Sequence, residues 1–281
     1  MCSGTRKVSR KALFFDIDGT LLSEVTRTVP ESAKQAIDTA RSQGHLVFVN
    51  TGRAYSELGA FKDELKTDGW LCGCGTYIEV EGKTLYHHMI PVEEGRAIKS
   101  AIRRFGMEAI LEGRDGCYVD GDTARNPRGQ AARKGIAFAI RPGDWDRDDW
   151  EFDKFCVMAD EESDRVGFFR SLSLDIDVID RGDEFYECVP AGHSKATAID
   201  VVLEHYGLSL KDAYVFGDST NDLPMFEHVP NAVLMGKHDK ELEPYASFNT
   251  KTVEQDGIWY AMNRLGLLGG IPVVCRTKRG I

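Results

Sequence analysis

Short apolar runs alternate with amphipathic stretches in the first third of this chain. The apolar runs stand at 11–15, 46–49 and 70–72, each bounded by polar residues or glycine. Between the first two, from Pro30 to Gly44, apolar residues recur at helical spacing, and 55–65 shows a similar spacing after the second. The pattern predicts strand, helix, strand, helix, strand, which is typical of a parallel sheet with right-handed crossovers.

The middle of the chain breaks this rhythm. Helices are predicted over 91–105 and 161–172, among strand-like runs at 108–111, 117–119, 152–158 and 175–179. Helices and short strands mixed in this way predict an α+β module with an antiparallel sheet.

From Pro190 the first rhythm returns. Helices are predicted over 194–205 and 253–265, and strands over 213–216, 232–234 and 246–248. The two ends of the chain are therefore expected to build one α/β core domain, 1–83 with 190–281. The middle, 84–189, is expected to be an inserted domain, which a fold tolerates when the two ends of the insertion lie close together.

Composition narrows the function classes. The chain has 281 residues, 42% hydrophobic and 28% charged, with a formal net charge of −10. That charge argues against nucleic acid or an anionic membrane as the main partner, and no apolar run is long enough to span a bilayer. Seven scattered cysteines do not suggest a disulfide framework, so a reducing cytoplasm is the expected compartment. A monomer or a homodimer is expected.

Two carboxylates directly follow the first predicted strand. Asp16 and Asp18 flank Ile17, so alternation along an extended chain would send both side chains the same way. At the carboxyl end of a parallel strand they would face the crevice where ligands bind, and Gly19 lets the backbone turn away. Two like charges this close repel unless a cation relieves them, so the pair indicates a metal site. The alternative is a polar turn after a buried strand.

Three further stretches place similar chemistry at the ends of predicted elements. Thr51 offers a hydroxyl beside Arg53, and Lys195 stands in the first turn of a helix, where an anion is favoured. Asp218 and Asp222 follow the strand at 213–216, with Asn221 between them. Carboxylate oxygens of this kind are the ligands that Mg²⁺ prefers. Each stretch alone has a structural explanation (a turn, a solvated lysine, a helix cap), but their conjunction favours a site for phosphate and a divalent cation.

These motifs resemble those of the haloacid dehalogenase (HAD) superfamily hydrolases, specifically the Cof-type phosphatases with a C2 (type IIB) cap. The segment DIDGTL at 16–21 matches the family's first motif, NTGR at 50–53 the second, Lys195 the third and GDSTNDLPM at 217–225 the fourth; EQDGI at 254–258 resembles the segment before the last helix. The resemblance covers nearly the whole chain. It implies a Rossmann-like parallel-sheet core with an inserted α+β cap domain.

The resemblance also implies a mechanism. Asp16 would be the nucleophile that forms an aspartyl-phosphate, and Asp18 the general acid and base. The implied ligands of Mg²⁺ are Asp16, the backbone carbonyl of Asp18, Asp218 and Asp222, with Asn221 in support. The implied phosphate-binding residues are Thr51, Gly52, Lys195 and Asn221.

One departure from the family pattern stands after the third predicted strand. Family members usually carry Asn-Gly-Ala there, whereas this chain has Cys74-Gly75-Thr76. The family's Asn often lies near the substrate, and this chain has a thiol in its place.

The predicted insertion also carries a local excess of basic residues. Between 122 and 144 it has five arginines or lysines and no acid, although the rest of the insertion is rich in acids. We expect Arg125, with Asn126, to face the catalytic carboxylates and contact the leaving group, because arginine suits oxyanion recognition. The alternative is a surface segment that balances nearby acids.

The expected activity is hydrolysis of a small phosphorylated metabolite, either a sugar phosphate or a phosphorylated cofactor. A phosphomutase of the same superfamily would share the core residues. A non-catalytic, phospho-accepting regulatory protein is the alternative from another class, and Asp18 argues against it because an acid/base beside the nucleophile serves turnover.

Overall fold

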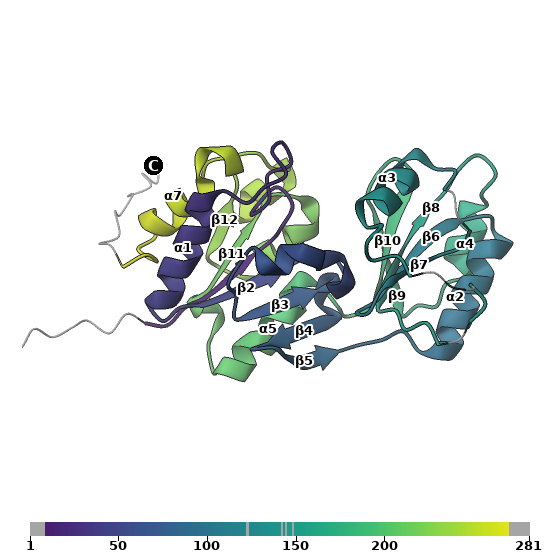
Figure 1. Cartoon of the computed structure of the whole chain (residues 1–281), viewed down its shortest axis with the longest axis horizontal. Helices are drawn as coiled ribbons and strands as arrows, with labels where there is room; N and C mark the ends of the chain where they lie inside the picture. Colours follow the sequence, from purple (N-terminus) through teal and green to yellow (C-terminus); the bar gives the residue numbers. More distant parts are fainter. Residues whose placement is uncertain (1–8, 122–123, 142, 144, 148, 270–281) are drawn as a thin grey trace, which may run out of the picture. The chain divides into compact units, whose positions relative to one another are not determined.

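Two β-sheets carry the fold in the computed structural model, which describes residues 9–121, 124–141, 143, 145–147 and 149–269 (Figure 1). The larger sheet has eight strands in the order β13-β12-β11-β1-β2-β3-β4-β5, and the smaller has five in the order β7-β6-β8-β10-β9. The strands of the larger sheet come from both ends of the chain and those of the smaller sheet from its middle. This arrangement confirms the predicted α/β core with an inserted α+β module.

The larger sheet is mostly parallel. Its strands are β1 (Ala12–Phe15), β2 (Leu46–Asn50), β3 (Gly69–Cys72), β4 (Tyr77–Val80), β5 (Lys83–His87), β11 (Ala213–Gly217), β12 (Ala232–Leu234) and β13 (Phe248–Asn249). The helices in these parts of the chain are α1 (Glu31–Ser42), α5 (Lys195–Tyr206), α6 (Leu223–His228) and α7 (Gly257–Arg264). β1 pairs in parallel with both β2 and β11, whereas β4 and β5 pair antiparallel.

β1 is a central strand of the larger sheet, with a neighbour on each side, and its four side chains are all apolar. All four of its residues are buried, as expected for a parallel strand covered on both faces. The ring of Phe14 stacks on Phe48 at a centroid distance of 5.2 Å, and Phe15 stacks on Phe216 at 4.4 Å. The predicted apolar stripe of α1 is buried as well. Periodicity therefore identified the core correctly here.

All neighbouring strands of the smaller sheet pair antiparallel. Its strands are β6 (Glu108–Glu112), β7 (Cys117–Val119), β8 (Lys154–Met158), β9 (Ile176–Asp180) and β10 (Phe185–Pro190), and its helices are α2 (Val92–Arg104), α3 (Pro127–Gly135) and α4 (Arg165–Ser171). One face contributes Leu111, Phe155 and Val157 to a core with residues of α2 and α4. The opposite face packs Ile110 and Met158 against residues of α3 and the segment that follows it.

The elements predicted from the sequence differ from the structure in four places. The segment predicted as a helix over 55–65 forms 3₁₀ turns over Tyr55–Asp63, broken at Gly59, whose φ of 49° and ψ of −133° no helix allows. The hairpin of β4 and β5 was not predicted; it turns through Glu81 and Gly82, both at positive φ. Strand β10 and helix α3 were not predicted either.

Contacts divide the chain into two compact units. The first unit comprises Met1–Asn50, Asp63–Gly69 and Ile199–Ile281, and the second comprises Thr51–Lys62 and Trp70–Ala198. The domain boundaries expected from the sequence, 1–83 with 190–281 around 84–189, stay a prediction. Within the described residues, none of the helices is both long and apolar enough to cross a membrane.

Burial of β1 predicts a large effect of truncating its aromatic residues. Phe14→Ala should lower the free energy of unfolding by about 3–5 kcal/mol, because it removes a fully buried ring from a close-packed core. Phe138→Ala is the matched control, since Phe138 is 57% exposed, and it should cost under about 1 kcal/mol. Urea denaturation followed by circular dichroism measures both; equal costs would contradict the assignment of β1 to the core.

Candidate active site

The backbone turns sharply directly after β1. The amide of Asp16 still donates to the carbonyl of Phe216 (3.0 Å), which extends the pairing with β11 by one bond. Leu21 and Leu22 then donate to the carbonyl of Ile17, and Gly19 donates to that of Leu22. Gly19 has a φ of +80°, and a Cβ there would lie 2.3 Å from Oδ2 of Asp218. Glycine is therefore required both for the turn and for the approach of a carboxylate.

The loop after β11 holds its carboxylates by short local bonds. Oδ2 of Asp222 accepts from the amides of Asp218 (2.9 Å) and Ser219 (3.2 Å), and Asp222 is fully buried. Oδ1 of Asp218 accepts from the hydroxyl of Thr20 at 3.0 Å. Oδ1 of Asn221 accepts from the hydroxyl of Ser219 at 2.8 Å. This loop is thereby tied to the turn after β1.

Three carboxylates converge where these two segments meet. One ligand oxygen from each of Asp16, Asp218 and Asp222 lies within 4.8 Å of the others. The parallel register of β1 and β11, which pairs Phe15 with Phe216, brings the carboxyl ends of the two strands to the same edge. An all-oxygen set of this kind fits Mg²⁺, which is held in proteins by one or a few carboxylates together with water and substrate phosphate. Of the four predicted metal-binding aspartates, these three come together.

Asp18 lies in the turn beside this cluster but is not a member of it. The expectation is that it contributes a backbone carbonyl to the metal and a side chain to proton transfer. The side-chain cluster tests neither role, so both stay predictions.

Thr51 and Gly52 directly follow the last residue of β2. Thr51 is buried; its amide donates to the carbonyl of Leu71 at 2.8 Å, and its hydroxyl accepts from the amide of Arg53 at 3.2 Å. The segment after β2 is therefore a tight turn that is hydrogen-bonded to β3. Its binding of phosphate stays a prediction.

Lys195 is the first residue of α5, as the sequence predicted, and only 1% of its surface is exposed. The residue before it caps the helix: the amide of Thr197 donates to Oγ of Ser194 at 3.2 Å, and the amide of Ser194 donates to Oγ1 of Thr197 at 2.9 Å. A buried ammonium at a capped helix N-terminus is suited to an anion. Its contact with phosphate also stays a prediction.

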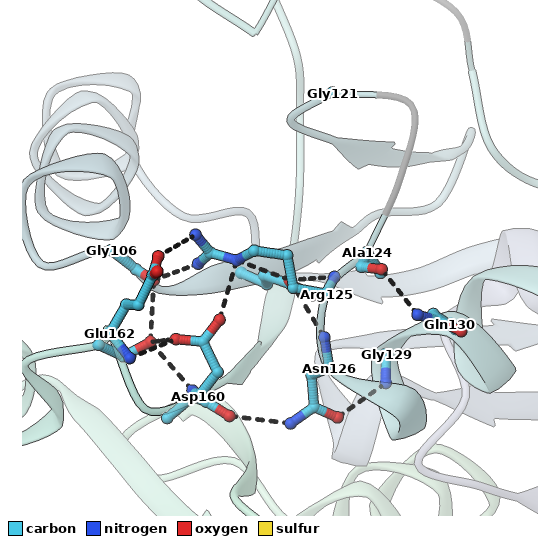
Figure 2. A network of polar contacts seen from close by, with 12 residues as sticks. Gly106, Gly121, Ala124, Arg125, Asn126, Gly129, Gln130, Asp160 and Glu162 are labelled. Atoms are coloured by element: carbon cyan, nitrogen blue, oxygen red, sulfur yellow. Dashed lines mark hydrogen bonds and ion pairs between the residues drawn. The ribbon is translucent and has the colours of Figure 1, made fainter.

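Arg125 and Asn126 form hydrogen bonds and ion pairs with other residues of the smaller-sheet module (Figure 2). Nε of Arg125 lies 2.8 Å from Oδ2 of Asp160 and 3.3 Å from Oε1 of Glu108, and its Nη2 donates to the carbonyl of Gly106 at 2.8 Å. Oδ1 of Asn126 accepts from the amides at the start of α3, at 2.8 and 3.2 Å. These contacts match the alternative in which the basic segment balances nearby acids. Contact with a leaving group stays a prediction for both residues.

Sequence reasoning did not single out a second group of charged side chains, on the smaller sheet. Lys154 lies between Glu112 and Glu187 and is buried with both of them. The available signal was a lysine inside an otherwise strand-like apolar run at 152–158. Its burial could not be foreseen, because both of its partners are distant in the chain.

Comparison with known proteins identifies the family of the chain. A family model described as haloacid dehalogenase-like hydrolase matches residues 13–262. A Bacillus subtilis (strain 168) protein named "Putative phosphatase YkrA" is 30% identical over 92% of this chain and 98% of its own length. From the same organism, a protein named 5-amino-6-(5-phospho-D-ribitylamino)uracil phosphatase YwtE is 25% identical over 91% of this chain and 98% of its own length.

Solved structures agree with that match. A hypothetical protein from Geobacillus kaustophilus HTA426 superposes with a TM-score of 0.82 at 30% identity, covering 92% of this chain and 99% of its own. A sugar phosphatase of HAD subclass IIB, BT4131, superposes with a TM-score of 0.76 at 26% identity, with the same coverage of both chains. The fold expected from the motifs is thus confirmed along nearly the whole chain.

The carboxylate cluster predicts a stabilising effect of Mg²⁺ that does not depend on turnover. A saturating concentration, about a hundredfold above the dissociation constant, should raise the Tm of the wild type by about 5 °C. Asp218→Asn should lose most of this rise. Without cation it should be no less stable than the wild type, because it removes one of three like charges.

Thermal scans with Mg²⁺ and with chelator measure both effects. Asp38→Asn is the matched control, since Asp38 lies on the exposed side of α1, and it should keep the full rise in Tm. A full Mg²⁺-dependent rise in Asp218→Asn would contradict the metal assignment.

Proposed function

This chain belongs to the haloacid dehalogenase-like hydrolases, and from that premise we propose that it is a Mg²⁺-dependent phosphatase of small phosphorylated metabolites acting through an aspartyl-phosphate. The observation that carries the proposal is the convergence of Asp16, Asp218 and Asp222 within 4.8 Å at the ends of β1 and β11. A nucleophilic carboxylate beside a metal site is the minimum that such chemistry requires.

In the first half-reaction, a carboxylate oxygen of Asp16 attacks the phosphorus of the ester. The bond from phosphorus to the leaving-group oxygen breaks, and Asp18 gives that oxygen a proton, so that the alcohol leaves neutral. The phosphoryl group is then bound to Asp16 as a mixed anhydride. One difficult displacement is thereby divided into two easier ones.

In the second half-reaction, Asp18 takes a proton from a water molecule. The resulting hydroxide attacks the same phosphorus, inorganic phosphate leaves, and the Asp16 carboxylate is regenerated, so protons and charges balance over the cycle. Thr51, Gly52, Lys195 and Asn221 hold the phosphoryl oxygens through both displacements, which depend mainly on positioning and electrostatics.

The residues that would hold Mg²⁺ are Asp16, Asp218, Asp222 and the backbone carbonyl of Asp18. When bound, the cation supplies positive charge that offsets the repulsion between a carboxylate nucleophile and an anionic phosphoryl group. The bonds from the amides of Asp218 and Ser219 keep the Asp222 carboxylate in place for this role.

The substrate class rests on the relatives. Proteins similar to this chain carry names that include a ribitylaminouracil phosphatase, HMP-PP phosphatases and a sugar phosphatase. The shared chemistry is a phosphoryl group on a small polar metabolite, and we propose the same class here, either a sugar phosphate or a phosphorylated cofactor.

A panel of such phosphate esters, assayed with Mg²⁺, tests the proposal. Release of inorganic phosphate from at least one ester, with no phosphorylated acceptor formed, is the expected result. Transfer of the phosphoryl group to a second hydroxyl of the substrate would instead indicate a phosphomutase. Stable phosphorylation of the protein without release would indicate a phospho-accepting regulatory protein.

Substitution of the two aspartates after β1 should separate their roles. Asp16→Asn should abolish turnover, because an amide is a poor nucleophile. Asp18→Asn should slow phosphate release by roughly 10² to 10⁴, the usual contribution of a general acid and base. Steady-state and burst kinetics measure both, with circular dichroism to show that the fold persists; near-normal release by Asp16→Asn would place the nucleophile elsewhere.

Lys195→Ala should lower kcat/KM by the same factor for every ester in the panel. The reason is that Lys195 is proposed to contact only the phosphoryl group, which all the esters share. The ratio of kcat/KM between wild type and variant, taken substrate by substrate, measures this. A loss confined to some leaving groups would assign Lys195 to the leaving-group side.

A further inference from the structure

The loop after β3 has an unusual backbone. Three consecutive residues, Gly73, Cys74 and Gly75, have positive φ values of 59°, 55° and 93°. Glycine adopts this region freely, but a residue with a Cβ does so only where its surroundings hold it there. Cys74 is therefore a constrained position, and what constrains it bears on the function of the loop.

The loop contacts both segments that are proposed to bind phosphate, all within the second unit. The amide of Cys74 donates to the carbonyl of Thr51 at 3.2 Å, and the amide of Gly73 donates to that of Arg53 at 2.8 Å. On the other side, a Cβ built on Gly75 would lie 2.6 Å from the carbonyl oxygen of Ser194, the residue before Lys195. A displacement of this loop would therefore move the supports of Thr51 and of the first turn of α5.

The side chain of Cys74 fixes the loop to the smaller sheet. Cys74 is 5% exposed, and its thiol donates to Oε1 of Glu187 on β10 at 3.4 Å. Burial, and then the negative charge of Glu187, raise the pKa of the thiol to about 12, so it stays protonated and remains a donor. The contact is thus a hydrogen bond to a carboxylate at neutral pH.

Glu187 is itself held on both oxygens. Its Oε1 also accepts from Nζ of Lys154 at 2.7 Å, and its Oε2 accepts from Nε of Arg181 at 3.0 Å. Burial alone would raise the pKa of this carboxyl, but the charges of Lys154 and Arg181 outweigh burial and lower it to about 2. Glu187 is therefore ionised and fixed at any pH at which the protein would work.

Lys154 joins this carboxylate to a second one on β6. Its Nζ lies 2.6 Å from Oε2 of Glu112, and the three side chains are only 3%, 5% and 8% exposed for Lys154, Glu112 and Glu187. Antiparallel register places Glu112 directly opposite Lys154. Buried ion pairs of this kind add little net stability because of their desolvation cost, but removing one partner is strongly felt. What the group does supply is a rigid, charged anchor for Cys74.

We propose that Glu187 is a positioning residue for phosphate binding: it holds Cys74 in its left-handed conformation and, through that loop, fixes Thr51 and the start of α5. This inference rests on the proposed function, because it takes Thr51 and Lys195 as the groups that contact phosphate. It also gives this chain's cysteine a role where the family usually has asparagine, since either side chain can donate to a carboxylate.

The test uses the full chain and inorganic phosphate as the probe. Cys74→Ala removes the donor and Glu187→Gln removes the charge, and each should weaken the binding of phosphate, measured by calorimetry with Mg²⁺, by about tenfold. Cys74→Asn should restore binding, because asparagine tolerates positive φ and its amide can donate to Glu187. The double variant should lose no more than the single ones, as expected for two residues that act through one contact.

Cys188→Ala is the matched control. Cys188 neighbours Glu187 on β10 and is fully buried, but it belongs to the core on the opposite face of the sheet. It should lower the Tm to a similar extent as Cys74→Ala while leaving phosphate binding unchanged. If Glu187→Gln does not fold, the loss in Cys74→Ala and its recovery in Cys74→Asn decide the matter.

Unchanged phosphate binding in Cys74→Ala would overturn the inference, as would an equal loss in Cys188→Ala. On the ester panel, kcat/KM should fall by the same factor for every substrate; a fall confined to certain leaving groups would also overturn it, because Glu187 would then be a substrate contact. If the wild type binds phosphate but hydrolyses no ester, the proposed function fails while the positioning role is still decided by the binding measurements.

Discussion

Repulsion among three carboxylates is the constraint around which the core is built. Asp16, Asp218 and Asp222 lie within 4.8 Å of one another, an arrangement that costs free energy unless positive charge compensates it. Three features of the fold hold them there. The buried parallel strands β1 and β11 end at the same edge, Gly19 leaves room for the side chain of Asp218, and backbone amides donate to Asp222. A cluster of this kind suits a cation, and the buried apolar strands behind it stabilise the backbone that holds the three carboxylates.

The sequence could predict this part of the molecule because its determinants are local. A buried apolar run followed by two acids and a glycine already specifies a strand, its carboxyl end and a tight turn, and the same reasoning applied to 213–222. The conjunction of the motifs then assigned the fold. Likewise, the spacing of apolar residues alone predicted the buried face of α1, which includes Ala36 and Ile37.

What could not be predicted depends on partners distant in the chain. The ion pairs of Arg125 are an example: the sequence around it lacks acids, but Glu108 and Asp160, 17 and 35 positions away, reach its guanidinium through the fold. Its contact with a leaving group stays a prediction. Lys154 was read as part of a strand, correctly, but only the pairing of β6, β8 and β10 shows that it is buried between two glutamates. The helix predicted over 55–65 failed for a different reason. Apolar spacing suggested a helix, but Gly59 has a φ and ψ that interrupt it, and the segment Tyr55–Asp63 forms 3₁₀ turns.

Buried charge is thus used in two opposite ways. In the first unit the cluster brings three carboxylates together, and positive charge from a bound cation would stabilise such an arrangement. In the second unit Lys154 and Arg181 already neutralise Glu112 and Glu187, and a network balanced in this way has no need of an added ion. Since such a network contributes little net stability, its main effect is on what it holds in place. The loop at Cys74, strained in its backbone and tied to both proposed phosphate-binding segments, is what it holds. Specificity for the phosphoryl group would then be set by rigidity next to the site as much as by the groups that touch it.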